Sequence, residues 1–154
     1  MSPALYFLRS SESKIVKDLT PYAHPKSENP HVYFEAYGLN GEDLGLYALV
    51  NNTLAGAIWC RRVPQNSLPE VSLAILPDFT QEEIDAIMME QFLQEVSVVH
   101  SEISARTYEN QALINFYKKF GFEEQEGSEL LVKKLTKQEI IRPKDNYDPQ
   151  RWMD

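Results

Sequence analysis

The stretch Asn110-Gln-Ala-Leu-Ile-Asn-Phe-Tyr-Lys-Lys-Phe-Gly-Phe122 carries the clearest pattern in this sequence of 154 residues. Its apolar residues recur at spacings of one, three and four, as on one face of a helix: Ala112, Leu113, Phe116, Tyr117 and Phe120. Asn110 is a favourable N-cap, because its side chain accepts a hydrogen bond from an amide one turn later. Gly121 suits the position after the helix, because glycine adopts positive φ without a Cβ clash. The stretch therefore predicts a capped helix with Tyr117 on its buried side.

Strands and helices alternate along the rest of the chain. Apolar runs predict strands at Ala4–Arg9, Leu44–Val50, Leu54–Arg61, Glu70–Leu76, Ser101–Ala105 and Glu129–Leu135. Further helices are expected over Ser11–Thr20, over the short Val32–Tyr37, and from Gln81 to about Val96 with Ile84, Ile87, Met88 and Phe92 facing inward. Asn51-Asn52-Thr53 between two apolar runs predicts a β-hairpin. The prolines predict loops at Pro21–Asn29 and Pro64–Pro69. Because the run from Glu70 is apolar on both faces, we expect a central strand there.

The helical stretch resembles a known signature. Asn110, Phe116-Tyr117 and Gly121-Phe122 are similar to the N-x-x-A-x-x-[LF]-Y-x-x-x-G-F pattern of the GNAT superfamily of acyl-CoA-dependent N-acetyltransferases, with Leu113 where alanine is usual. The order of elements over residues 4–135 also resembles that family. The resemblance implies an α/β (α+β), GNAT-like fold over residues 1–135, with a central mixed, mostly antiparallel sheet flanked by helices. Residues 136–154 form a tail outside the resemblance, and its apolar residues indicate docking on its own domain or on a neighbouring subunit.

Charge and cysteine content limit the partners. The net charge of −8 argues against nucleic acid and anionic membranes, and it favours cationic substrates. The single cysteine, Cys60, fits a reducing compartment, and no apolar stretch is long enough to span a membrane. The N-terminus lacks the pattern of a signal peptide, so we expect a cytoplasmic protein. Three scattered histidines and one cysteine give no metal-ligand spacing, so no metal is expected.

The resemblance places the acetyl-CoA pyrophosphate at the start of the helix from Gln81, in a loop of the form [QR]-x-x-G-x-[GA]. Free amides and the positive end of a helix dipole suit an anion there. In this sequence Thr80 takes the first position, while Glu83 and Asp85 take the two glycine positions. The residues alone have another explanation, since Thr80 with Glu83 forms a capping-box pattern and acids in a first turn stabilise a helix. For a bound pyrophosphate the same acids are repulsive.

Further roles follow from the resemblance. Tyr117 would contact acetyl-CoA and protonate the departing thiolate, because a phenol is protonated at neutral pH. The alternative is that Tyr117 is a core aromatic residue. Asn110 would contact the pantetheine arm, or act only as the helix cap. The outward amides and carbonyls of Leu73, Ala74, Ile75 and Leu76 would pair with that arm as an added strand does.

An attacking amine must lose a proton, so a base is needed. Glu70 at the start of the central strand is the first candidate, acting directly or through a water; the alternative is a surface glutamate. His31 is the second candidate, in a region that borders the acceptor site in the family, although most lone histidines are structural or solvated.

Two functions remain. The first is transfer of an acetyl group from acetyl-CoA to a primary amine, either a small molecule or an amino terminus. The second is a catalytically inactive GNAT-like fold that serves as a binding or protein-interaction module, which the acids Glu83 and Asp85 favour. Dimers are common in the family, so a homodimer is a further expectation.

Overall fold

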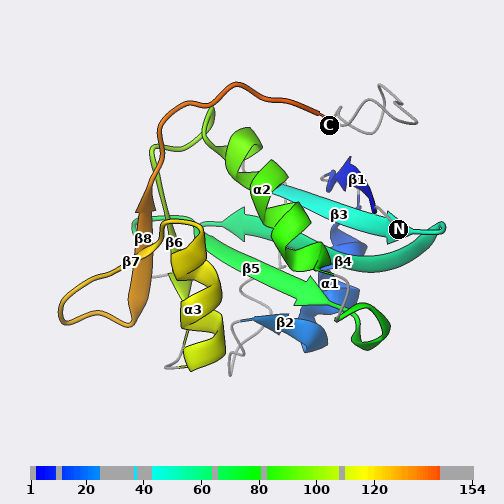
Figure 1. Cartoon of the computed structure of the whole chain (residues 1–154), viewed down its shortest axis with the longest axis horizontal. Helices are drawn as coiled ribbons and strands as arrows, with labels where there is room; N and C mark the ends of the chain where they lie inside the picture. Colours follow the sequence, from blue (N-terminus) through cyan, green and yellow to red (C-terminus); the bar gives the residue numbers. More distant parts are fainter. Residues whose placement is uncertain are drawn as a thin grey trace.

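The computed structural model describes residues 3–9, 12–24, 37, 43–63, 66–80, 83–107 and 110–142. Its main sheet has the strand order β1-β3-β4-β5-β6-β8-β7 (Figure 1). The strands are β1 (Ala4–Phe7), β3 (Leu44–Val50), β4 (Thr53–Arg61), β5 (Glu70–Ile75), β6 (Glu102–Arg106), β7 (Glu123–Glu124) and β8 (Leu130–Lys134). Among the strands of the described residues, only β5 and β6 are parallel, and the other pairs are antiparallel. The predicted mixed, mostly antiparallel sheet with a central strand from Glu70 is thus confirmed.

Helices cover both faces of the sheet. The helices α2 (Ile84–Val96) and α3 (Gln111–Lys119) pack on one face, and α1 (Ser13–Leu19) lies behind the other (Figure 1). The predicted inward position of Ile87 is wrong, because its side chain is 38% exposed while Met89 is fully buried. Successive residues of a helix are about 100° apart around its axis, and at this spacing Ile87 lies just outside the buried face of α2.

Local backbone signals are confirmed. Asn51 and Asn52 have φ of 53° and 65°, as in a tight hairpin turn between β3 and β4. The Asn110 side chain accepts from the amide of Leu113 at 3.0 Å and so caps α3. Gly121 has φ of 91°, and its amide and that of Phe122 donate back to the last turn at 3.1 and 3.3 Å. These two bonds form a Schellman motif, which fixes where α3 ends.

The N-terminal region differs from the prediction. A 3₁₀ turn over Thr20–Tyr22 leads into a two-residue strand, β2 (Ala23–His24), in the segment predicted as a loop. β2 pairs antiparallel with β5. So short a strand has no periodic pattern, which is why the sequence predicted a loop there. The predicted helix at Val32–Tyr37 falls almost wholly outside the described residues.

Residues 136–142 of the tail dock on their own domain. The backbone amide of Gln138 donates to the Ser97 hydroxyl at 3.0 Å, at the end of α2. Arg142 then donates to both oxygens of Glu95, at 2.9 Å each, and its guanidinium lies 5.4 Å from the centre of the Phe7 ring. These contacts join the described tail to α2 and β1.

Candidate active site

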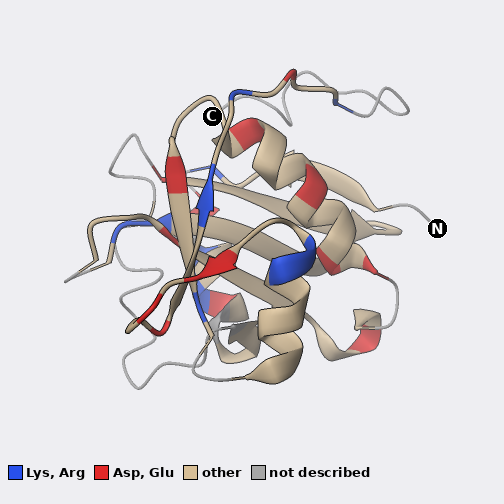
Figure 2. Ribbon diagram, turned by 60° about the vertical axis from the view of Figure 1, so that its left-hand side comes forward, with Lys and Arg blue, Asp and Glu red and all other residues tan. Residues whose placement is uncertain are grey.

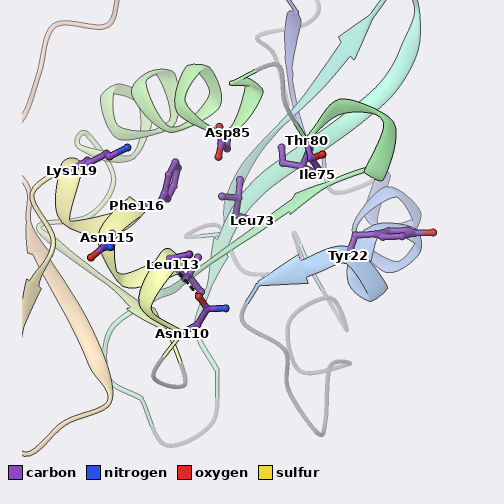
Figure 3. A pocket seen from close by; sticks show the side chains of 11 residues that line it. Tyr22, Leu73, Ile75, Thr80, Asp85, Asn110, Leu113, Asn115, Phe116 and Lys119 are labelled. Carbon is purple, nitrogen blue, oxygen red and sulfur yellow. Dashed lines mark hydrogen bonds between the residues drawn. The ribbon is translucent and has the colours of Figure 1, made fainter.

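A cleft of about 410 Å³ lies between β5, the start of α2 and α3 (Figure 3). Its wall contains Tyr22, Leu73, Ile75, Thr80, Asp85, Asn110, Ala112, Leu113, Asn115, Phe116 and Lys119. Five of the residues singled out in the sequence therefore meet in one place: Leu73, Ile75, Thr80, Asp85 and Asn110. Leu73 and Ile75 lie on β5, Thr80 and Asp85 lie near the start of α2, and Asn110 caps α3. The fold brings these three regions together.

The start of α2 has an unusual backbone. Glu83 precedes the helix with φ of 56° and ψ of 24°, the left-handed conformation that favours glycine, and no side-chain hydrogen bond caps the helix. The predicted capping box is wrong, because Thr80 has helical φ and ψ and its hydroxyl donates to the carbonyl of Pro77 at 3.2 Å. Glu83, which aligns with the first glycine of the loop pattern, thus has a glycine-like backbone conformation and an exposed side chain that ends in a carboxylate.

Asp85 supplies a negative charge within the first turn of α2. One of its carboxylate oxygens accepts from the backbone amide of Ala86 at 2.8 Å. That amide is one of the groups that a bound anion would otherwise use. Lys119, from the last turn of α3, lines the same cleft (Figure 3) and carries the opposite charge; Figure 2 shows this basic end of α3.

The edge of β5 that faces the cleft is partly paired. β5 and β6 share only the register pair Glu70 and Ser104, so their pairing is limited to the first residue of β5 and the middle of β6. Further along, β2 pairs with Leu73 and Ala74 on this edge. The amide of Leu76 donates to the carbonyl of Ala55 on the β4 side at 2.8 Å, so it does not face outward as expected.

Tyr117 is fully buried beside the cleft. Its ring packs edge-on against Phe122 at 5.0 Å and against the cleft residue Phe116 at 5.7 Å. Burial raises the pKa of its hydroxyl well above the usual value, and the nearby charge of Glu70 raises it further. Within the described residues this hydroxyl has no hydrogen-bond partner. Such a buried, unpaired group is unfavourable by about 1–3 kcal/mol, so a partner supplied by a ligand fits here.

Glu70 is buried, so its interpretation as a surface glutamate is wrong. The Nε of Arg106 donates to Glu70 Oε1 at 3.0 Å, and a terminal nitrogen of the same guanidinium lies 3.5 Å from Oε2. Arg106 also contacts Glu129 at 3.4 Å. The sequence did not reveal Arg106 as the partner, because 36 residues separate it from Glu70. His31 lies outside the described residues.

Asn115 and Lys119 are cleft residues that the sequence reasoning missed. They follow Ala112 on α3 by three and seven residues, and this helical spacing is the signal that could have identified them. Among the described residues, no group of three or more His, Cys, Asp or Glu side chains is arranged to hold a metal ion. None of the helices in the described part of the chain is both long and apolar enough to cross a membrane.

Comparison with known proteins identifies the protein family. A family model described as "Acetyltransferase (GNAT) family" matches residues 12–122, and the chain belongs to this family. A search of curated proteins gives no match.

Solved structures share the fold. The ribosomal-protein-S18-alanine N-acetyltransferase of Escherichia coli is similar with a TM-score of 0.68 and 13% identity, over 96% of this chain and 100% of that one. The PaiA N-acetyltransferase of Thermoplasma acidophilum, in complex with coenzyme A, gives a TM-score of 0.63 and 17% identity, over 87% and 99%. The IAA acetyltransferase of Bacillus cereus gives 0.63 and 14%, over 87% and 100%.

Proposed function

We propose that this protein transfers an acetyl group from acetyl-CoA to a primary amine, on a small molecule or at a peptide amino terminus. The cleft beside β5 carries the proposal, because it gathers Leu73, Ile75, Thr80 and Asn110 next to the buried hydroxyl of Tyr117. Family membership supports the same reaction class. Two of the neighbouring proteins are named as N-acetyltransferases, one of them acting on an alanine of a ribosomal protein.

In the proposed reaction the amine nitrogen attacks the acetyl carbonyl carbon, a carbon–nitrogen bond forms, and the carbon–sulfur bond breaks. The thiolate that leaves takes up a proton, and the amine loses one. Tyr117 is the proposed acid, and its raised pKa keeps the hydroxyl protonated at neutral pH. Glu70 is the proposed base, directly or through a water, and Arg106 holds its carboxylate at 3.0 Å.

The residues of the cleft fit acetyl-CoA in part. The apolar wall of Leu73, Ile75 and Phe116 suits the pantetheine arm, and Lys119 supplies a positive charge for the phosphates. Glu83 and Asp85 oppose those phosphates. Binding is therefore expected to be weaker than a glycine-rich loop would give.

The experiment is an acetyl-transfer assay against a panel of amines and short peptides, with thiol release as the readout. Replacing Tyr117 with Phe removes only the hydroxyl, and we expect the turnover number to fall by at least tenfold with little change in acetyl-CoA affinity. Tyr47→Phe is the matched control, because Tyr47 lies on β3 and its hydroxyl contacts Glu12, away from the cleft. Wild-type turnover in Tyr117→Phe would rule out the proposed acid.

The second candidate function is a GNAT fold that no longer uses acetyl-CoA and serves as an interaction module. It is favoured by the two acids at the start of α2 and by the β2 pairing on β5. This function requires that millimolar acetyl-CoA leave the thermal midpoint of the protein unchanged. A saturable stabilisation at micromolar acetyl-CoA would reject it.

A further inference from the structure

The β2 strand occupies a specific part of the β5 edge. Ala23 lies opposite Ala74, and His24 lies opposite Leu73, in an antiparallel register. The other edge of β5 is paired with β4 along its whole length, from Glu70 to Ile75. β2 therefore uses the edge that the early divergence of β5 and β6 leaves unpaired.

The same edge is the one that a pantetheine arm needs under the proposed function. That arm is an extended chain with two amide groups, and it would bind β5 as an added strand does, through backbone donors and acceptors. Alternate residues of a strand direct their backbone groups to the same edge, and the Leu76 amide bonds to Ala55 of β4, so Ala74 also faces β4 and Leu73 faces β2. The amide and carbonyl of Leu73 that pair with β2 are not available to a second strand on the same edge. The cleft wall formed by Leu73 and Ile75 adjoins this edge, so both partners approach the same place.

We propose that β2 is a displaceable inhibitory strand, and that acyl-CoA binds β5 only after β2 has left Leu73. This inference rests on the proposed function. Two opposed residue pairs in an antiparallel ladder contain one pair of backbone hydrogen bonds. Here that pair joins His24 and Leu73, because Ala74 faces β4.

The small size of β2 sets the expected effect. Two net backbone hydrogen bonds correspond to a factor of roughly 5 to 100 in the equilibrium between paired and open β2. The apparent dissociation constant for acyl-CoA rises by the same factor, because only the open form binds. The side chain of Ala23 is buried with Val16 and Leu19, which keeps the segment near β5 after the hydrogen bonds break.

A reversible crosslink tests the proposal. Ala23→Cys combined with Ala74→Cys places two thiols directly opposite each other, at a separation suited to a disulfide. The native Cys60 is fully buried and does not compete. The dissociation constant for acetyl-CoA is measured calorimetrically on the oxidised and the reduced forms of this variant, after a thiol count confirms the crosslink. Val50→Cys with Thr53→Cys, an opposed pair beside the β3–β4 turn, is the matched disulfide control.

We expect the reduced variant to bind acetyl-CoA and the oxidised variant to bind at least tenfold more weakly, with no such change in the control. In a second arm, His24→Pro removes the β2 amide that faces Leu73 and so one of the two hydrogen bonds, and we expect acetyl-CoA to bind about 2 to 10 times more tightly than to wild type. Equal binding by the oxidised and reduced forms, or a His24→Pro variant that folds and binds no more tightly than wild type, overturns the inhibitory strand and leaves the proposed function standing. Absence of binding at millimolar acetyl-CoA in every form, including His24→Pro, overturns both.

Discussion

Replacing Arg142 with Met tests whether the ion pair at the end of the described tail stabilises the fold. The pair with Glu95 has two contacts of 2.9 Å, and the exposed side-chain fractions are 34% for the arginine and 2% for the glutamate. Methionine retains an unbranched apolar stem that can cover Phe7, so the substitution removes mainly the charge. Gln91 donates to Glu95 at 3.0 Å, and we expect the variant to keep this contact.

The magnitude follows from the burial of the carboxylate. Removing one partner of a fully buried ion pair destabilises a protein by about 3–5 kcal/mol. Because Arg142 is one-third exposed, water reaches part of the space that it leaves, and we expect about 2–3 kcal/mol. For a chain of this size, that corresponds to a decrease in thermal midpoint of about 4–12 °C.

Calorimetry or circular dichroism on matched variants provides the measurement. Lys14→Met is the control, because Lys14 and Asp18 are closer, at 2.7 Å, but are 82% and 55% exposed. An exposed pair at this helical spacing contributes only about 0.3–0.5 kcal/mol. Adding Glu95→Gln to Arg142→Met removes the buried charge and should restore most of the lost stability. If Arg142→Met lowers the midpoint no more than Lys14→Met, the reasoning from burial is refuted.

Three further predictions concern the cleft and the core. Glu83→Gly should tighten acetyl-CoA binding without loss of stability, because glycine suits the φ of 56° at this position. The control Glu90→Gly, within α2, should lower the free energy of unfolding by about 1 kcal/mol. Equal losses for the two variants in denaturant unfolding would contradict this prediction. Lys119→Ala should weaken acetyl-CoA binding at least threefold, while Lys118→Ala, which removes a surface contact with Glu124, should not; the comparison is made by titration calorimetry. Burial raises the pKa of Cys60 from 9.0 to about 12. The unfolded thiol therefore loses its proton first. The thiol's contribution to the free energy of unfolding should be constant well below pH 9 and decrease as the pH rises from 9 towards 12; Cys60→Ala should remove this part of the alkaline decrease in denaturant titrations.

Elements determined by local chemistry were predictable from the sequence. The hairpin turn needs two residues that tolerate positive φ, and Asn51 and Asn52 provide them. Helix α3 needs a cap at each end: the Asn110 side chain suits the first position, and Gly121 suits the second because it lacks a Cβ. In both cases the deciding contacts lie within a few residues, where spacing and residue type carry the information.

Contacts between distant segments were not predictable in the same way. The burial of Glu70 depends on Arg106, which reaches it only because β6 lies beside β5 in the sheet. The pairing of β2 with β5 depends on where β6 diverges, and a two-residue strand leaves no periodic signal. The capping box failed for a related reason, because the pattern of Thr80 and Glu83 does not determine the backbone conformation that a cap requires.

Three features of the cleft influence a bound acyl-CoA, and their responses to salt differ. Glu83 and Asp85 repel the phosphates, Lys119 attracts them, and β2 competes through uncharged backbone groups. Raising the ionic strength from 0.1 to 1 M shortens the screening length from about 10 to 3 Å, which weakens both charge effects and leaves the competition of β2 almost unchanged. Acetyl-CoA affinity that rises with salt would mean that the acids dominate, and affinity that falls would mean that Lys119 dominates. A weak, salt-independent affinity that His24→Pro strengthens would identify β2 as the main barrier.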